Sequence, residues 1–282
     1  MLILAVDTTS VSGSIALARD AALLGVVSVL SQEGFSTRMF REVEFLNVEL
    51  GISLSDIDLY AVNAGPGSFT GLRVGLTAVK AWAEVYRKPI AAVSGLAAVA
   101  AQFSVTRGFD GDGAGGGTGD SPGGNRSEYI VPVVDARRGQ IYGGVYRRIA
   151  SGLEACGEDC VMAASEFLRE VRDRLASGPV TPVTFVTPDQ HLLQSVIAES
   201  EFSGCRLEFA SPVLAPWIAG LGLAQSHRGE LVDALQLEAN YIRRPDAEKG
   251  VESDAKKDAE SGTGTEAGMA GGTGHQPAGG VS

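Results

Sequence analysis

The chain opens with Leu2-Ile3-Leu4-Ala5-Val6-Asp7-Thr8-Thr9-Ser10, an apolar run that ends in an aspartate and a polar turn. A continuous apolar run of this length is typical of a strand that is covered on both faces of a sheet. The pattern recurs later, where a second apolar strand at 129–134 ends in Asp135 and is followed by a polar turn and another strand at 141–147. The repetition predicts two halves that are built on one plan.

The elements between these two strands follow from the hydrophobic period. The ranges 14–19 and 22–30 have the character of a strand hairpin, whereas the apolar residues of 36–50 recur at helical spacing. The pattern then predicts a strand at 59–63, a helix at 68–87, a strand at 89–93 and a helix at 94–103. The order strand-strand-strand-helix-strand-helix-strand-helix predicts a mixed sheet in the first lobe of a two-lobed α/β protein.

Composition divides the chain into four parts. A first lobe is expected at 1–107, a Gly-rich insertion at 108–127, a second and less regular lobe at 128–246, and an acidic tail at 247–282. The insertion and the tail contain too little apolar surface to offset the entropy lost on ordering. A flexible insertion and a disordered tail are therefore predicted.

Charge and composition limit the functions to be considered. The net charge of -11 repels a phosphate backbone, so nucleic-acid binding without a basic partner is not expected. The chain shows no cationic leader and no apolar run near the roughly 20 residues that span a bilayer, which favours a cytoplasmic protein without membrane contact. Its three cysteines and three histidines lack the paired spacing of a metal site, so no metal is predicted.

The most specific stretch of the chain is Gly65-Pro66-Gly67-Ser68-Phe69-Thr70-Gly71-Leu72-Arg73-Val74-Gly75. It lacks the lysine of a phosphate loop and the Gly-x-Gly-x-x-Gly spacing of a dinucleotide site. Ser68 suits a helix cap, but each glycine inside the helix costs about 1 kcal/mol relative to alanine. The close approach of another helix would compensate for this cost, and periodicity alone leaves open whether that helix belongs to this chain or to a partner.

The two aspartate turns suggest a nucleotide site. Hydroxyl and backbone N–H groups of such a turn can converge on a phosphate, and a carboxylate can hold hydrated magnesium. A purely structural polar turn is the simpler alternative. If Asp7, Thr8 and Thr9 faced Asp135 across a cleft, the chain would instead be an ATP-dependent phosphotransferase or ATPase.

Four segments together resemble the TsaB/YeaZ family: Met1 to Thr9, the Gly65 to Gly75 stretch, the turn Val134-Asp135-Ala136-Arg137, and Tyr241-Ile242-Arg243-Arg244. Their order and spacing agree from Met1 to about Glu248. The resemblance implies a two-lobed actin/Hsp70/sugar-kinase-like fold. It also implies a non-catalytic scaffold and dimerisation subunit of the complex that makes N6-threonylcarbamoyladenosine (t6A) in tRNA.

The resemblance further implies the partners. The subunit would bind a catalytic TsaD-like paralogue, with the help of a TsaE-like ATPase, and would meet tRNA only indirectly. It would need no cofactor of its own, because ATP and magnesium would be bound mainly by the partners. Alone, it is expected to form a homodimer.

Carried onto this chain, the resemblance places the partner interface on the helices at 36–50 and 68–87. The implied residues are Met39, Val43, Gly67, Ser68, Phe69, Thr70, Gly71, Arg73, Gly75 and Ala78. The residues Asp7, Thr8, Thr9 and Asp135 would be a vestigial nucleotide cleft. Many relatives have a histidine where this chain has Phe35, so a role of that histidine is not available here. The Gly-rich insertion and the tail lie outside the family pattern.

Overall fold

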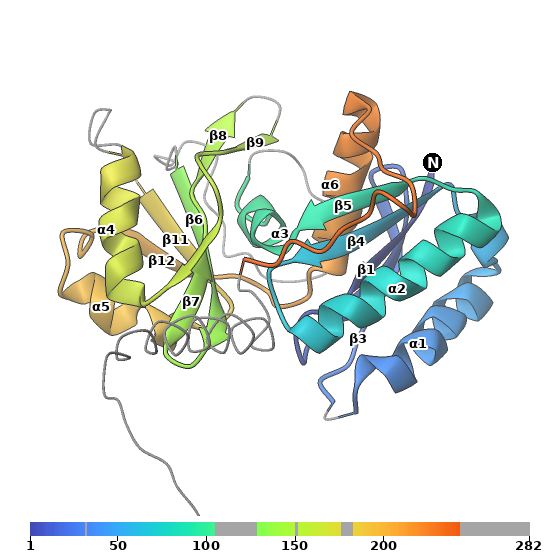
Figure 1. The fold of residues 1–282 in the computed structure, drawn as a ribbon, viewed down its shortest axis with the longest axis horizontal. Coiled ribbons are helices and arrows are strands. Elements are labelled where there is room, and N and C mark those ends of the chain that lie inside the picture. The colour runs from blue at the N-terminus through green and yellow to red at the C-terminus, as the bar shows by residue number, and fades with distance from the viewer. Residues whose placement is uncertain (32, 105–128, 150–151, 176–182, 243–282) are drawn as a thin grey trace, which may run out of the picture. The chain divides into compact units, whose positions relative to one another are not determined.

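A computed structural model describes residues 1–31, 33–104, 129–149, 152–175 and 183–242 (Figure 1). The insertion predicted at 108–127 and the tail predicted at 247–282 both lie outside the described residues.

The first sheet is built from the N-terminal part of the chain. Its strands stand in the order β3-β2-β1-β4-β5, with β1, β2 and β3 antiparallel and β4 and β5 parallel to β1. All six residues of β1 are buried, which is the double coverage that its continuous apolar run predicts. The strands and the helices between them are β1 (Leu2–Asp7), β2 (Ser14–Arg19), β3 (Ala22–Ser28), α1 (Phe35–Leu50), η1 (Leu54–Asp56), β4 (Leu59–Gly65), α2 (Phe69–Tyr86), β5 (Ile90–Ser94) and α3 (Gly95–Ala101).

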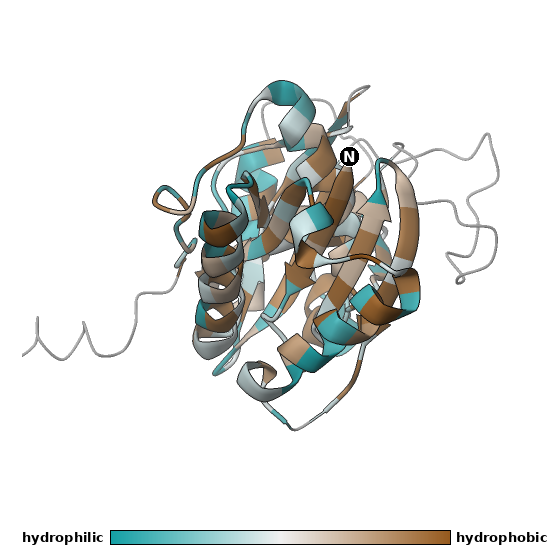
Figure 2. Cartoon of the chain, turned by 90° about the vertical axis from the view of Figure 1, so that its right-hand side faces the viewer, coloured by the Kyte–Doolittle hydropathy of each residue, from teal (hydrophilic) through white to brown (hydrophobic). Residues whose placement is uncertain are grey.

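Helices cover both faces of this sheet (Figure 1). Alternate residues of β1 point to opposite faces. Leu4 and Val6 belong to the core under α1 and α2, whereas Ile3 and Ala5 belong to the core under α6 (Ala215–Arg228). Figure 2 shows this arrangement by residue hydropathy. The strands are mostly hydrophobic, and the helices that flank them carry both hydrophobic and hydrophilic residues.

The second sheet begins, like the first, with a strand that has an aspartate near its end and pairs with an antiparallel neighbour. Its main path runs in the order β10-β7-β6-β11-β12, and β8 pairs with β6 and with β9. As β1 does in the first sheet, β6 ends near an aspartate and turns back into an antiparallel neighbour, β7. The elements are β6 (Tyr129–Arg137), β7 (Gln140–Gly143), β8 (Tyr146–Ile149), β9 (Gly152–Ala155), β10 (Cys160–Met162), α4 (Ala164–Leu175), β11 (Val183–Thr187), η2 (Gln190–Leu192), α5 (Gln194–Ala198) and β12 (Arg206–Phe209).

The C-terminal part of the described chain returns to the first sheet. Helix α6 packs on β1, β2, β4 and β5, and its Gly222 lies so close to the sheet that an added Cβ would stand 2.9 Å from the Cβ of Ala61. Beyond α6, Val232 pairs with Ile90, and the backbone N–H of Asn240 donates to the carbonyl of Ala64 at 2.7 Å. Helix α6, which lies within the second lobe predicted at 128–246, thus packs on strands of the first sheet.

Among the described residues, none of the helices has the length and the apolar character that crossing a membrane requires.

Candidate functional site

The Asp7 turn stands at the carboxyl end of β1, and Asp7 itself is fully buried. Its Oδ1 accepts hydrogen bonds from the backbone N–H of Thr9 at 3.0 Å, from the Thr9 hydroxyl at 2.7 Å and from the amide of Asn63 at 3.0 Å. Within the described residues, its Oδ2 is buried without a hydrogen-bond partner. Burial raises the pKa of Asp7, and the hydrogen bonds from Thr9 and Asn63 oppose this rise.

Asn63 completes the network from β4. Its amide also donates to the Thr9 hydroxyl at 3.0 Å, and its Oδ1 accepts from the backbone N–H of Gly65 at 2.9 Å. The polar groups of the Asp7 turn are thus satisfied by this chain, apart from one carboxylate oxygen. These hydrogen bonds join the ends of β1 and β4. They leave few donors or acceptors of Asp7, Thr9 and Asn63 available to a ligand.

The glycines of the Gly65 to Gly75 stretch lie against the Asp7 turn. The Thr8 hydroxyl donates to the carbonyl oxygen of Gly71 at 2.7 Å, and the backbone N–H of Ser68 donates to the carbonyl of Thr9 at 3.0 Å. A Cβ added to Gly75 would stand 2.5 Å from the Thr8 hydroxyl oxygen, and one added to Gly71 would overlap the Thr8 carbonyl. The interpretation that these glycines admit another helix is therefore wrong, because the close neighbour is a turn of this chain.

The residues implied as a partner interface divide into two groups. Met39, Val43, Gly75 and Ala78 are buried beneath α1 and α2, so they form core contacts and cannot present their side chains to a partner. The exposed members are Ser68, Thr70 and Arg73, with Gly67, Phe69 and Gly71 half-buried.

Phe69 and Arg73 contact the C-terminal part of the described chain. The ring centroids of Phe69 and Tyr241 are 5.1 Å apart. The Arg73 guanidinium lies 3.9 Å above the Phe69 ring, and its Nε donates to the Tyr241 hydroxyl at 3.3 Å. Tyr241, which belongs to one of the four segments that resemble the TsaB/YeaZ family, thus contacts the start of α2.

Four exposed apolar side chains on α1 and α2 were missed by the sequence interpretation, and one of them, Phe45, lines the hollow beside β3. The exposed fraction is 55% for Phe40, 71% for Val48 and 71% for Val85. The Phe40 ring meets the ring of Trp82 on α2 edge-on, with centroids 6.1 Å apart. We call Phe40, Val48 and Val85 the outer apolar surface. Its signal in the sequence is that these residues fall outside the apolar stripes of their helices.

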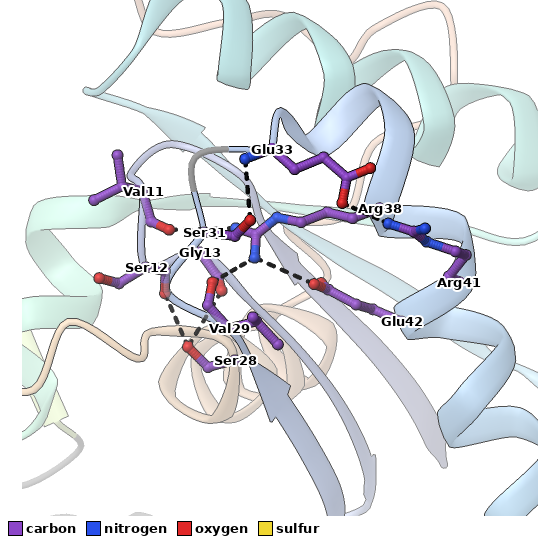
Figure 3. Close-up of polar contacts among 10 residues, drawn as sticks. All are labelled: Val11, Ser12, Gly13, Ser28, Val29, Ser31, Glu33, Arg38, Arg41 and Glu42. Atoms are coloured by element: carbon purple, nitrogen blue, oxygen red, sulfur yellow. Dashed lines mark hydrogen bonds and ion pairs between the residues drawn. The ribbon is translucent and has the colours of Figure 1, made fainter.

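A buried ion pair lies within α1, and its arginine contacts the backbone next to the first sheet (Figure 3). The Nη1 atom of Arg38 lies 3.3 Å from the Oε1 atom of Glu42, and both side chains are buried. Arg38 donates to the carbonyl of Val11 at 3.3 Å and to the carbonyl of Val29, and its guanidinium lies 3.8 Å above the Phe35 ring. Burial raises the pKa of Glu42, whereas the charge of Arg38 lowers it. The two carbonyl contacts of Arg38 fix α1 to the turn after β1 and to the end of β3, and Glu42 neutralises the buried charge of Arg38.

Asp135 is placed differently from Asp7. It is exposed, and it accepts from the backbone N–H of Arg137 at 2.7 Å and pairs with the Arg137 guanidinium at 3.2 Å. Two hollows are described, one between α1 and β3 and one beside the end of α2, and neither is lined by Asp7 or Asp135. The nucleotide cleft stays a prediction. In the described part of the chain, no group of three or more histidine, cysteine and acidic side chains is arranged to hold a metal.

The two sheets, the repeated strand-aspartate-turn pattern and the helical crossovers define a mixed α/β protein. YeaZ from Pseudomonas aeruginosa has the same fold, with a TM-score of 0.65 and 23% identity over 85% of this chain and 99% of that structure. In sequence, the chain is 29% identical to the tRNA threonylcarbamoyladenosine biosynthesis protein TsaB of Bacillus subtilis, over 90% of this chain and 99% of that protein.

Two further comparisons agree. The TsaB protein of Escherichia coli is 28% identical over 64% of this chain and 70% of its own length. The family model of TsaD, tRNA N6-adenosine threonylcarbamoyltransferase, matches residues 11–112. The chain is thus similar over most of its length to proteins of the TsaB/YeaZ family.

Proposed function

We propose that this protein is a non-catalytic scaffold subunit in the synthesis of tRNA threonylcarbamoyladenosine, and that it binds a TsaD-like paralogue through α1 and α2. The names of its TsaB relatives support the pathway. The TsaD family model matches 11–112, the part of the chain that carries both helices. Two related lobes can pair through like surfaces, as subunits of symmetric dimers do.

The outer apolar surface carries this proposal. Its three apolar side chains are exposed on α1 and α2, two helices that contact each other, and exposed apolar surface of this kind is a candidate interaction site. Phe40 is the natural centre of such a contact, because aromatic side chains are enriched among the residues that dominate binding energy. Its edge-on contact with Trp82 restrains the ring, so less conformational entropy is lost when a partner covers it.

The Asp7 network supports the non-catalytic part of the proposal. A fully buried carboxylate whose Oδ1 already accepts three hydrogen bonds is poorly placed to hold magnesium or a phosphate. The reaction, with ATP and magnesium, would then take place on the TsaD-like partner and a TsaE-like ATPase. The net charge of -11 supports an indirect contact with tRNA, because a negative surface repels the phosphate backbone. We further propose that the protein is cytoplasmic and that it self-pairs when alone.

Phe40→Ser tests the proposal, with Phe45→Ser as the matched control. Both phenylalanines lie on α1 and are about equally exposed, at 55% and 56%, but Phe45 lines the hollow beside β3 on the other side of the helix. Calorimetric titration with the TsaD-like paralogue should show affinity reduced by about 30-fold or more for Phe40→Ser, as for a residue that dominates an interface. Phe45→Ser should stay within about threefold of the parent.

The result is informative only if both variants fold, which their melting temperatures establish. Equal affinities of the parent and a folded Phe40→Ser variant would contradict the proposal. A homodimer through the same surface should dissociate more readily in the same variant, as measured by analytical ultracentrifugation.

The free Oδ2 of Asp7 favours a second candidate, an ATP-dependent phosphotransferase or ATPase. Titration of the protein with magnesium and ATP separates the two functions. Heat of binding that is lost in Asp7→Ala, together with turnover, would favour the second candidate over the scaffold. Absence of heat at millimolar nucleotide would remove it.

A further inference from the structure

Three side chains join the two sheets by hydrogen bonds. Ser94 is the last residue of β5 in the first sheet, Tyr146 is the first residue of β8, and Asp159 stands directly before β10 in the second. The Tyr146 hydroxyl donates to Asp159 Oδ1 at 3.1 Å, and the Ser94 hydroxyl donates to Asp159 Oδ2 at 3.1 Å. One carboxylate therefore holds a hydroxyl from each sheet.

Ser94 has a second role that makes this contact sensitive to helix structure. Its hydroxyl oxygen also accepts from the backbone N–H of Ala97 at 3.2 Å, which caps the start of α3. Helix α3 packs on β4 and β5 of the first sheet and on β6 and β9 of the second, and its apolar residues belong to a core that both sheets share. A shift of the Asp159 carboxylate would therefore move the Ser94 hydroxyl and weaken the cap of α3.

The position of the carboxylate is fixed by close packing. A Cβ added to Gly144 would overlap the carboxylate of Asp159 and stand 3.0 Å from the Tyr146 ring. The Arg174 guanidinium donates to the carbonyls of Cys156 at 3.3 Å and Glu158 at 2.9 Å, in the segment that leads to Asp159. Burial raises the pKa of Asp159, and the hydrogen bonds from Tyr146 and Ser94, with the charge of Arg174, oppose the rise.

The contact lies at the edge of the sheet where ligands bind in related architectures. β1, β4 and β5 are parallel, so Asp7, Gly65 and Ser94 mark the same carboxyl edge. Ligands of open α/β sheets bind outside this edge. Next to Ser94, a Cβ on Gly95 would stand 2.8 Å from the amide nitrogen of Asn63, which belongs to the Asp7 network.

We propose that Ser94, Tyr146 and Asp159 form a latch, which must open before the second sheet can move away from the carboxyl edge of the first. The latch is independent of the proposed partner surface, because none of its residues lies on α1 or α2. Separation of the two sheets would break the contacts of the Ser94 hydroxyl with Asp159 at 3.1 Å and with the Tyr146 hydroxyl at 3.4 Å. The Tyr146–Asp159 hydrogen bond stays within the second sheet and holds the carboxylate toward Ser94.

Hydrogen exchange of the full chain, followed by mass spectrometry, tests the latch in Tyr146→Phe and Asp159→Asn. Each variant keeps the shape of the side chain and removes hydrogen-bonding capacity. Exchange at Gly95–Ala101 and Cys160–Met162 should rise by up to about tenfold, the effect of losing one hydrogen bond of ordinary strength. Exchange within β1 and β2 should stay at the parent level.

Tyr60→Phe is the matched control. Tyr60 is also a buried tyrosine, but its hydroxyl donates to the carbonyl of Leu54 at 2.9 Å, within the first lobe. It should leave exchange at Gly95–Ala101 and Cys160–Met162 unchanged. The double variant Tyr146→Phe with Asp159→Asn should show no more exchange than the stronger single variant. Unchanged exchange at the latch segments, a uniform rise over the whole chain, or additive effects would each overturn the proposal.

Discussion

The hydroxyl of Thr8 donates a hydrogen bond of 2.7 Å to the carbonyl oxygen of Gly71, across a sequence separation of 63 residues. This bond joins the turn after β1 to the first turn of α2. It explains why glycine is needed there, because the Thr8 backbone occupies the space that a side chain on Gly71 would fill. The Gly65 to Gly75 stretch thus packs directly against the Asp7 turn.

Gly71→Ala should lower the free energy of unfolding by about 1–3 kcal/mol, the usual cost of overpacking a closely packed site. The added Cβ overlaps a backbone carbonyl, which cannot move without disturbing Asp7. Urea denaturation measures the change. Gly204→Ala is the control, because a Cβ there meets no atom within 4 Å, and a stability change within about 0.5 kcal/mol is expected. Equal stability of the two variants would contradict the overlap.

Asp7→Asn should change the pH dependence of stability. Burial raises the pKa of Asp7 above its ordinary value of 3.8, so the folded chain keeps a proton that the unfolded chain releases. In the window above pH 3.8, and up to the raised pKa, the parent therefore loses stability as pH rises. The asparagine variant lacks this loss, so its stability relative to the parent should increase through the window by up to about 1.4 kcal/mol per pH unit.

Urea denaturation of both proteins at several pH values checks this prediction. The sign is the decisive observation. A relative stability of the variant that falls with rising pH would mean that the hydrogen bonds from Thr9 and Asn63 outweigh the burial of Asp7.

Arg38→Met should lower the free energy of unfolding by about 3–5 kcal/mol, as for the loss of one partner of a buried ion pair. Glu42 then stays buried without its partner, and the carbonyls of Val11 and Val29 lose a donor (Figure 3). Arg41→Met is the control. Its pair with Glu33 is exposed, so a cost within about 1 kcal/mol is expected.

The double variant Arg38→Met with Glu42→Leu separates charge burial from packing. It should recover part of the loss, because apolar residues of similar volume replace a buried pair without leaving a charge behind. Thermal and urea unfolding of the single and double variants give the comparison. A double variant as unstable as the sum of the two single changes would show that the carbonyl contacts, and not the buried charge, dominate.

Tyr241→Ala should loosen the start of α2. The change removes the ring contact with Phe69 and the acceptor of the Arg73 hydrogen bond, with an expected cost of about 1 kcal/mol. Tyr241→Phe keeps the ring and loses only the hydroxyl, so it should cost less. Hydrogen exchange at Phe69–Gly71 reports the effect, and equal exchange in the parent and the alanine variant would mean that this C-terminal contact does not hold the helix.

The sequence by itself determined the features that depend on local pattern. The continuous apolar run of β1 and its ending at Asp7 predict a strand covered on both faces, and the recurrence at Asp135 predicts the second sheet. The glycines of 65–75 mark a place of close approach, and four segments of the chain resemble the TsaB/YeaZ family. These features are legible because periodicity records which face of an element is apolar.

Only the tertiary structure decided what covers each face. It placed Thr8 beneath Gly71, returned α6 to the first sheet, and put Phe40 on the surface while burying Met39 and Val43. These pairings join residues that are far apart in the chain, and an apolar or a glycine-bearing face has the same local pattern whichever surface packs on it. The choice is made by long-range packing, which removes the most apolar area from water while keeping the buried polar groups hydrogen-bonded.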